Sequence, residues 1–377
     1  MNQRINLEKI IELRHTLHQK AELSLCERET LQFIKRFLTE NTSLSVTERD
    51  GWLFAVKQGH DKKEKIAFRA DMDALPIPET INLPYASGHP GVSHKCGHDG
   101  HMAVLLALAL GLEVMETEKS VCLVFQPAEE TGQGGRICRD LIWEEGIREI
   151  YAFHNLPGYP EGSIVFREGL TQPASEGLKL SFTGKMSHAS APEEGNNPAE
   201  VLAQIILFSQ KLTRKYTDEM LLCTVTGVKL GDGDFGISPG DGELCLTLRA
   251  EREEDMKQLE TEICSFAAEL AEAAGLSLAC SIHDYFPETR NNPECLAKVL
   301  HAAACLGKKS IAMDRLWRAS EDFGYYLKEC PGAMFYIGCG ETYPALHTTA
   351  YDFNDRILET AIDMFLLLAA GEMTTDK

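Results

Sequence analysis

The chain has 377 residues, 44% of them hydrophobic, and carries 57 acidic against 37 basic residues, for a net charge of −20. A chain of this length and apolar content can bury more than one hydrophobic core, so two domains are expected. The acidic balance, with no block rich in Lys or Arg, argues against nucleic acid or an anionic membrane as a partner.

Strands and helices are predicted to alternate through the first half of the chain. Residues 7–20 have apolar side chains at helical spacing, and residues 102–115 are apolar almost all round, as in a buried helix. Short apolar runs at 65–70, 120–126 and 149–153 are typical of buried strands. This alternation predicts an α/β fold with a mostly parallel sheet and helices on both faces.

The pattern changes near Gly177, where alternation of apolar and polar residues begins. Predicted strands follow at 178–184, 221–230, 242–251 and 277–285, with predicted helices at 198–216 and 254–274. The order β-α-β-β-α-β is ferredoxin-like. Helix–strand alternation then resumes to the end of the chain. We therefore predict one α/β domain from residues 1–176 and 284–377, interrupted by an inserted α+β domain over 177–283.

Metal-capable side chains follow each of the three predicted strands of the first half. They are Asp71 and Asp73 after the first strand, Glu129 and Glu130 after the second, and His154 after the third. Cys96 and His98 lie just before the buried helix. Parallel strands end at one edge of a sheet, and a helix that returns antiparallel to them starts there. These side chains are therefore expected to converge.

The segment KCGHDGHMAVLL, residues 95–106, raises three interpretations: half of a structural zinc knuckle, a redox cysteine, or one wall of a catalytic metal site. A structural zinc site needs a second Cys/His knuckle, and the sequence has none. None of the twelve cysteines forms a C-x-x-C pair, which argues against a redox protein. A catalytic site mixes His, carboxylate and sometimes one Cys, as this segment and its neighbours do.

Reduced thiols in a cytoplasmic protein are the simplest interpretation of the scattered cysteines. The charged N-terminal segment lacks the apolar core of a signal peptide. No apolar run is long enough to cross a bilayer. The sequence therefore predicts a cytoplasmic protein without a membrane partner.

The adjacent Glu129 and Glu130 could belong to a solvated loop, the commoner fate of neighbouring acids. They follow a buried strand, however, and precede TGQGG, whose glycines let backbone approach a ligand. Two such glutamates can divide the work, one binding metal and the other acting as general base on a metal-bound water. His154 could equally be a core histidine, and His101 is expected at the helix start or behind a ligand.

Further candidates lie later in the chain. His347 is predicted in a loop before the last helix. His188 lies in the turn-rich loop GKMSHASAPEEGNNP. It could be an ordinary surface histidine, or it could reach the metal cluster as part of a lid, from the same chain or from a partner subunit. Arg249 could clamp a substrate carboxylate, although a surface ion pair is the commoner role. Asn197 is a second substrate-binding candidate.

Seven ordered motifs resemble those of the metal-dependent amidohydrolases of the aminoacylase/carboxypeptidase superfamily. They are RADMDALPIPE, KCGHDGHMA, QPAEETGQGG, FHNLPGYPEG, GKMSHASAPEEGNNP, SEDFGYYL and ALHTTAYDFND. The most similar branch contains hippurate hydrolase, N-acetyldiaminopimelate deacetylase and the indole-acetyl-amino-acid hydrolases. The resemblance covers nearly the whole chain. It implies two divalent metal ions (Zn, Mn, Co or Ni) in the α/β domain, and a lid and dimerisation role for residues 177–283.

The resemblance also implies roles for single residues. The matches to the family's metal ligands are Cys96, His98, Glu130, His154 and His347. Glu129 matches the catalytic base, and Asp73 an acidic residue that orients a ligand. His188 matches a lid histidine that helps to polarise the scissile carbonyl, often across a homodimer. Gly236 stands where relatives often carry an asparagine, so an amide that could contact substrate is absent or supplied elsewhere.

The sequence thus predicts an enzyme that hydrolyses the amide bond of a small N-acyl amino acid with metal-activated water. Glu129 would carry the proton from water to the leaving amine, and His188 would stabilise the developing oxyanion. A dipeptidase or carboxypeptidase acting on small peptides is the alternative. A metal-binding protein without catalysis is more remote, since it needs no unligated base. A homodimer through the inserted domain is expected.

Overall fold

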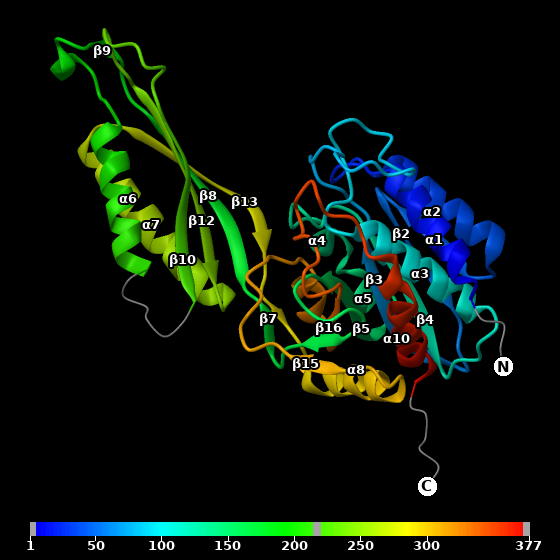
Figure 1. Ribbon diagram of the computed structural model, residues 1–377. Helices are drawn as coiled ribbons and strands as arrows, with labels where there is room; N and C mark the ends of the chain where they lie inside the picture. Colours follow the sequence, from blue (N-terminus) through cyan, green and yellow to red (C-terminus); the bar gives the residue numbers. More distant parts are fainter. Residues whose placement is uncertain (1–4, 214–219, 372–377) are drawn as a thin grey trace. The chain divides into compact units, whose positions relative to one another are not determined.

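Two units make up the chain in the computed structural model, which describes residues 5–213 and 220–371 (Figure 1). The first unit comprises Met1–Thr171, Thr289–Leu316 and Glu321–Lys377, and the second Gln172–Glu288 and Trp317–Ser320. The predicted insertion, 177–283, falls within the second unit, which begins earlier and ends later. Trp317–Ser320 joins this unit because the Arg249 guanidinium donates to the Arg318 carbonyl and the Ser320 hydroxyl, both at 2.8 Å.

The centre of the first unit is an eight-stranded sheet in the order β1-β2-β4-β3-β5-β16-β6-β15. Its strands are β1 (Ser45–Arg49), β2 (Trp52–Lys57), β3 (Asp61–Asp71), β4 (Lys119–Gln126), β5 (Ile147–Leu156), β6 (Ile164–Phe166), β15 (Ser310–Ala312) and β16 (Gly332–Gly338). Strands β4, β3, β5 and β16 are parallel, and β2 and β6 pair with their outer members antiparallel. The mostly parallel sheet predicted from the sequence is confirmed.

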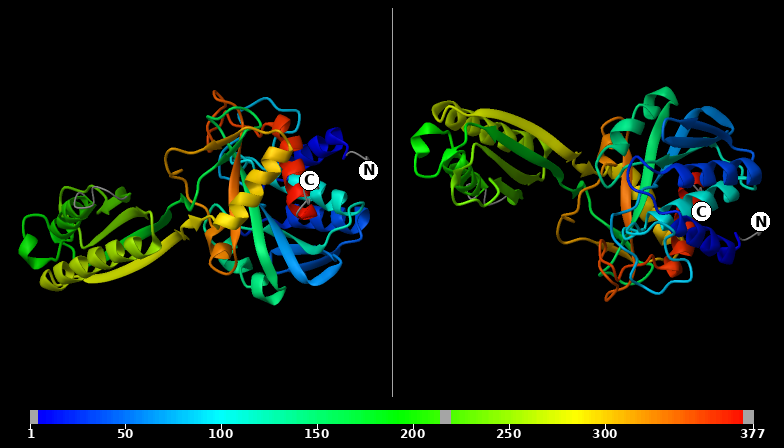
Figure 2. Two further views of the ribbon diagram at one scale, coloured as in Figure 1. Left: turned by 90° about the horizontal axis from the view of Figure 1, so that it is seen from below. Right: turned by 90° about the horizontal axis from the view of Figure 1, so that it is seen from above.

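Helices pack against both faces of this sheet (Figure 2). They are α1 (Leu7–Gln19), α2 (Arg28–Asn41), α3 (His98–Leu112), α4 (Gly134–Cys138), α5 (Leu141–Glu144), α8 (Pro293–Cys305), α9 (Gly324–Leu327) and α10 (Leu358–Ala370). α3 connects β3 to β4, whereas α4 and α5 connect β4 back to β5 on the other side of β3. Because right-handed crossovers that run in opposite directions put their helices on opposite faces, α3 and α4–α5 cover different faces.

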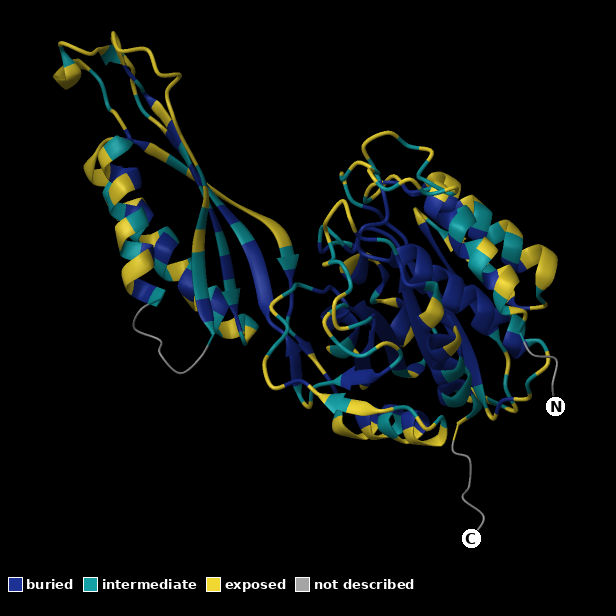
Figure 3. Cartoon of the chain, viewed as in Figure 1, coloured by how far each residue is buried: buried dark blue, intermediate teal, exposed yellow. Residues whose placement is uncertain are grey.

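α3 lies in the interior of the first unit. Every residue of this helix except Leu110 is buried, and it contacts α1, α10 and β3 (Figure 3). Its sequence HDGHMAVLLALALGL offers no polar face, so the helix is stable only where it is covered all round. Its first residue, His98, is thereby fixed at the carboxyl edge of the sheet.

The second unit consists of a four-stranded antiparallel sheet, in the order β10-β12-β8-β13, and two helices on one of its faces (Figure 1). Its elements are β8 (Ala174–Thr183), α6 (Ala199–Thr213), β10 (Leu221–Leu230), β12 (Asp241–Ala250), α7 (Glu253–Ala273) and β13 (Ser277–Phe286). This is the predicted β-α-β-β-α-β order. The predicted end of the first helix, 214–216, lies outside the described residues. A short pairing also joins β9 (Ser187–His188) to β11 (Ile237–Ser238).

The twelve cysteines are free thiols. Several lie in the core, such as Cys122 on β4 and Cys339 after β16, where a thiol packs as a small apolar side chain. Within residues 5–213 and 220–371, no helix has both the length and the apolar character needed to cross a bilayer.

Candidate metal centre

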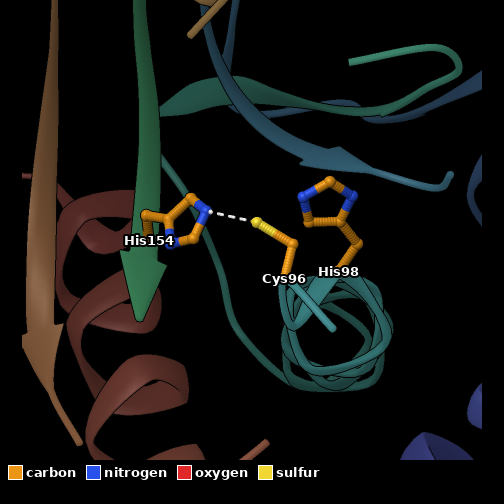
Figure 4. Close-up of side chains that lie close together, drawn as sticks. All are labelled: Cys96, His98 and His154. Carbon is orange, nitrogen blue, oxygen red and sulfur yellow. Dashed lines mark hydrogen bonds between the residues drawn. The ribbon is translucent and has the colours of Figure 1, made fainter. Parts of the chain in front are cut away.

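Side chains that could bind a metal ion gather at the carboxyl edge of the central strands. β3 ends in Asp71, and Asp73 follows two residues later; Glu129 and Glu130 follow β4; His154 lies near the end of β5. Cys96 precedes α3, and His98 begins it (Figure 4). Because β3, β4 and β5 are parallel, their carboxyl ends meet, and the structure brings these side chains together with His347 from the loop before α10.

Two groups of possible metal ligands share one sulfur atom. Cys96 Sγ lies 3.4 Å from His154 Nε2 and forms one group with His154 and His98 (Figure 4). The same Sγ lies 3.3 Å from His347 Nε2, which is 3.5 Å from Glu130 Oε1. Cys96, Glu130 and His347 form the second group, and in both groups all ligand atoms lie within 4.8 Å of one another. This arrangement can hold two cations side by side.

Two buried polar atoms of these two groups lack a hydrogen-bond partner, as expected of atoms that bind a cation. Among the described residues, His98 Nε2 and Glu130 Oε1 are buried and have no hydrogen-bond partner. Burial raises the pKa of the Cys96 thiol well above its usual range, and the carboxylates of Glu130 and Glu129 raise it further. A thiolate can persist there only beside a positive charge such as a metal ion. The donor set of sulfur, imidazole and carboxylate suits a borderline-soft divalent metal.

A hydrogen bond from Nδ1 orients each of the imidazoles of His98 and His154. His98 Nδ1 lies 2.8 Å from the Asp73 carbonyl, and His154 Nδ1 lies 2.8 Å from the Asn155 carbonyl. Both Nε2 atoms therefore face the centre. The Asp73 carboxylate accepts from the Ser24 hydroxyl at 2.6 Å and from the Glu130 N–H at 3.0 Å. It thereby fixes the backbone from which the Glu130 side chain projects.

His101 stands behind the ligands. Its Nδ1 lies 2.6 Å from Asp71 Oδ1, and its Nε2 lies 2.7 Å from Asn155 Oδ1. Both ring nitrogens are thus engaged with protein groups. Asn155, which sequence reasoning missed, also donates to the Cys96 carbonyl at 3.0 Å and to the Tyr351 hydroxyl at 2.6 Å. Its position beside His154, as a polar residue at the end of a buried strand, was the available signal.

Glu129 lies in a buried, negatively charged setting. The residue is only 5% exposed. Burial raises the pKa of its carboxyl well above the usual range, and the neighbouring Glu321 and Glu130 raise it further. The positive charge of Arg69 lowers the pKa of Glu129 and so offsets part of this shift. The Arg69 guanidinium pairs with Glu321 at 3.0 Å and with Asp322 at 2.8 Å. A carboxyl of raised pKa can accept a proton and later release it.

The loop that carries Glu129 turns back tightly on itself. Ala128 has a left-handed φ of 51°, and its carbonyl accepts from Gly134 N at 3.1 Å. A Cβ atom at Gly134 would lie 1.6 Å from the Pro127 carbonyl oxygen, and one at Gly135 would lie 2.3 Å from the Asp322 carbonyl oxygen. These glycines therefore allow a close approach to the chain's own backbone, and not the close approach to a ligand that the sequence predicts.

Replacing Gly134 by alanine is expected to lower the free energy of unfolding by about 1–3 kcal/mol, because the added methyl must displace backbone. Urea unfolding would measure the loss. Gly227→Ala is the matched control, since a Cβ there meets its nearest neighbour at an ordinary 3.5 Å. Equal stability of the two variants would contradict the close approach of the loop.

A buried ion network joins α1 to the start of α3. The Arg14 guanidinium lies 3.2 Å from Asp99 and 2.9 Å from both Asp352 and Asp355. His18 lies 2.8 Å from Asp99 through Nδ1 and 2.8 Å from Glu79 through Nε2. Burial alone would lower the pKa of His18, but the hydrogen bonds to Asp99 and Glu79 outweigh it and raise the pKa to about 9.

This shift predicts a pH-dependent contribution of His18 to stability. The folded-state pKa of about 9 exceeds the unfolded value of about 6.5. The contribution is therefore complete below about pH 6.5 and disappears as pH rises through about 9. The free energy of unfolding, measured with urea, should be higher for the wild type than for His18→Gln. This difference should be about 3 kcal/mol larger at about pH 6 than at about pH 9.5. The exposed His60 provides the control His60→Gln. A difference that does not vary with pH would refute the charged pair.

The remaining sequence candidates belong to the second unit. His188 is exposed on β9, and its Nδ1 lies 2.7 Å from the Ser190 hydroxyl. The Asn197 side chain caps α6 by accepting from Ala199 N at 2.8 Å, and it donates to the Ser238 hydroxyl at 3.1 Å. Burial lowers the pKa of Arg249, whose contacts are with Arg318 and Ser320. These three side chains are thus engaged within their own unit.

Comparison with known proteins connects this geometry to a family. Residues 67–370 match the model of peptidase family M20/M25/M40. N-acetyldiaminopimelate deacetylase of Lactobacillus helveticus is 29% identical, over 96% of this chain and 98% of its own length. N-acetylcysteine deacetylase of Bacillus subtilis is 30% identical, over 98% of each chain. Hippurate hydrolase of Campylobacter jejuni is 31% identical, over 95% of this chain and 94% of its own length.

One solved structure bears on the metals. The YXEP protein of Bacillus subtilis, described as a dinuclear metal-binding peptidase from the M20 family, superposes with a TM-score of 0.81. It is 27% identical in sequence, over 97% of each chain. The likeness thus extends across both units of the chain.

Proposed function

The chain belongs to peptidase family M20/M25/M40 and is an amidohydrolase, and we propose that it removes the acyl group from a small N-acyl amino acid. The observation that carries the proposal is Glu129, a buried carboxyl of raised pKa beside two groups of ligand side chains. A protein that only stored metal would need no such base. The deacetylase and hippurate hydrolase names of the relatives support an N-acyl amino acid as the substrate.

We assign one divalent metal ion to Cys96, His98 and His154, and a second to Cys96, Glu130 and His347. The shared sulfur and the unsatisfied His98 and Glu130 atoms support this assignment. When bound, such ions lower the pKa of a water molecule and polarise the acyl carbonyl. Zn, Mn, Co and Ni all suit the donor set.

In this proposal Glu129 moves the proton. Its carboxylate accepts a proton from the attacking water and delivers it to the nitrogen of the leaving amine. Glu129 Oε2 lies 3.9 Å from His98 Nε2, so the carboxylate is close to the proposed ligand groups. Asp73 acts as a positioning residue through its contact with the Glu130 backbone. Arg249 stays a candidate for contact with a substrate carboxylate, and Asn197 a candidate for binding the substrate.

We also propose that His188 stabilises the oxyanion and that two copies of the chain associate through the second unit. His188 pairs with Ile237 across β9 and β11. Exposed apolar side chains lie on the two paired segments: Met186 two residues before His188, its strand partner Ile237, and Phe235, which is 100% exposed and lies two residues before Ile237. Such a patch fits contact with another protein surface. A cytoplasmic location is proposed as well, supported by the free cysteines.

Mixing two inactive variants would locate the action of His188. His188→Ala and Glu129→Gln should each be nearly inactive alone. If His188 acts across a dimer, exchange of subunits should restore about a quarter of wild-type activity, because half of the random dimers are mixed and each holds one intact site. No recovery, in mixtures that sedimentation shows to be dimeric and exchanged, would place His188 in its own subunit's site.

The substrate proposal is tested by metal analysis of the purified protein and a hydrolysis panel of N-acetyl amino acids, N-benzoyl amino acids and dipeptides. Release of acetate or benzoate with a free amino acid supports a deacylase. Cleavage of dipeptides alone would favour the peptidase alternative. Bound metal with no turnover on any amide would leave a metal-binding protein.

A further inference from the structure

The two ligand groups that share Cys96 differ in how firmly the fold fixes them. Cys96, His98 and His154 are all buried, and they project from the start of α3 and from β5. The His347 side chain is 50% exposed, and its backbone has a left-handed φ of 59° in a loop. The group of Cys96, Glu130 and His347 therefore depends on what holds this loop.

Lys95, the residue before Cys96, contacts the loop at two places. Its carbonyl accepts from His347 N at 2.8 Å, and its ammonium donates to the Tyr351 carbonyl at 2.8 Å. The first bond is made by backbone and would survive a change of side chain. The second bond depends on the lysine side chain, and it connects Lys95 to Tyr351, four residues after His347.

The Lys95 ammonium is fully buried, so its charge has to be met inside the protein. Glu79 meets it with a carboxylate oxygen, while the other oxygen of Glu79 lies 2.8 Å from His18 Nε2. The lysine thus has two acceptors, a carboxylate and the Tyr351 carbonyl. These two contacts fix the position of Nζ between Glu79 and the loop that holds Tyr351.

Asn155 also contacts this loop, but its hydrogen bonds affect both ligand groups. Asn155 donates to the Cys96 carbonyl and to the Tyr351 hydroxyl, and it follows His154 in the chain. A change at Asn155 would disturb both groups. The hydrogen bonds of the Lys95 side chain go to Glu79 and to Tyr351 of the His347 loop rather than to His98 or His154. The effect of losing this side chain should therefore be confined to one group.

We propose that Lys95 is a positioning residue for one of the two metal ions, the one assigned to Cys96, Glu130 and His347. Its ammonium fixes Tyr351, and through that loop it keeps His347 Nε2 within reach of Cys96 Sγ and Glu130 Oε1. The ion assigned to Cys96, His98 and His154 does not depend on it. The inference rests on the proposed function, because it assumes the two-metal centre.

Titration of metal-free Lys95→Met with Co²⁺ tests the inference. One equivalent should bind with wild-type affinity and give the thiolate-to-cobalt charge-transfer absorption of Cys96. The affinity for the second equivalent should fall by about 10–100-fold, the usual effect of losing a group that orients a ligand. A variant that binds both ions as the wild type does would overturn the inference, and so would one in which both affinities fall equally.

Lys65→Met is the matched control. It removes another buried lysine, 7% exposed and paired with Glu145, at the start of β3's buried segment rather than near the ligands. It should bind both ions normally. Lys95→Gln, which keeps an N–H donor, should lose less affinity for the second ion than Lys95→Met. If neither Lys95 variant folds while Lys65→Met does, Lys95 is a folding residue and the inference fails.

Failure of the proposed function gives a different result. Wild-type protein that binds fewer than two Co²⁺ ions, or binds two without hydrolysing any N-acyl amino acid, would count against the metal centre or the activity. Wild-type protein that binds two and is active, together with an unaffected Lys95→Met, would count against the role of Lys95 alone.

Discussion

Replacement of Glu129 by glutamine is expected to lower kcat by about a thousandfold while both metal ions stay bound. Glutamine keeps the volume of the side chain but cannot accept the proton of the attacking water, and general bases contribute about 10²–10⁴ to the rate. The measurement is kcat on the best N-acyl amino acid of the panel, together with the metal content of the same preparation.

Glu145→Gln serves as the control for this experiment, because it also neutralises a paired glutamate but lies near Lys65, away from the ligand groups. It should retain wild-type turnover. Near-normal kcat for Glu129→Gln would remove Glu129 from the role of base. Loss of a metal ion from that variant would instead make Glu129 a ligand.

Replacement of Cys96 by serine is expected to lower the affinity for both metal ions and to abolish activity. The sulfur belongs to both ligand groups. A neutral hydroxyl is a much poorer ligand than a thiolate for these metals, so each affinity should fall by more than about a hundredfold. Titration of the metal-free variant with Zn²⁺ against a chelating dye would measure both affinities.

His154→Ala provides the comparison, because His154 belongs to only one of the two groups that contain Cys96. It should lower the affinity for one ion and leave most of the affinity for the other. Should Cys96→Ser bind two ions tightly, the shared-sulfur assignment would be wrong. Far-ultraviolet circular dichroism of both variants would show that the fold is retained.

The sheet edge on which the centre lies could be predicted because its elements leave strong local patterns. Strands buried on both faces appear as continuous apolar runs, and α3 has no polar face. Once β3, β4 and β5 are parallel, their carboxyl ends meet, whatever the packing details. Topology alone therefore predicts that Asp71, Glu129 and His154 lie close together.

The contacts that orient the ligands could not be predicted in this way. Arg14 reaches Asp99 and Asp355, and Lys95 reaches Tyr351, across segments distant in sequence. Such pairs have no periodicity, and an acidic chain offers each basic residue many possible partners. Only the folded structure selects among them.

The glycines after Glu130 show a second limit. A glycine in the sequence can indicate that another atom lies close to its Cα, but it does not show whether that atom belongs to a ligand or to the protein. At Gly134 the neighbour is the Pro127 carbonyl rather than a ligand. The tight turn at Ala128 is equally hidden, since alanine gives no sign of a left-handed backbone.

The order of the ligands along the chain matters during synthesis. The ribosome delivers Cys96, His98, Glu130 and His154 before any residue of the second unit's sheet, but His347 only near the end. β16, the neighbour of β5, also emerges after that unit is made. Until residue 347 has been made, a nascent chain can thus assemble at most one of the two proposed ligand groups. A chain that stops before residue 347 would accordingly lack the proposed group of Cys96, Glu130 and His347.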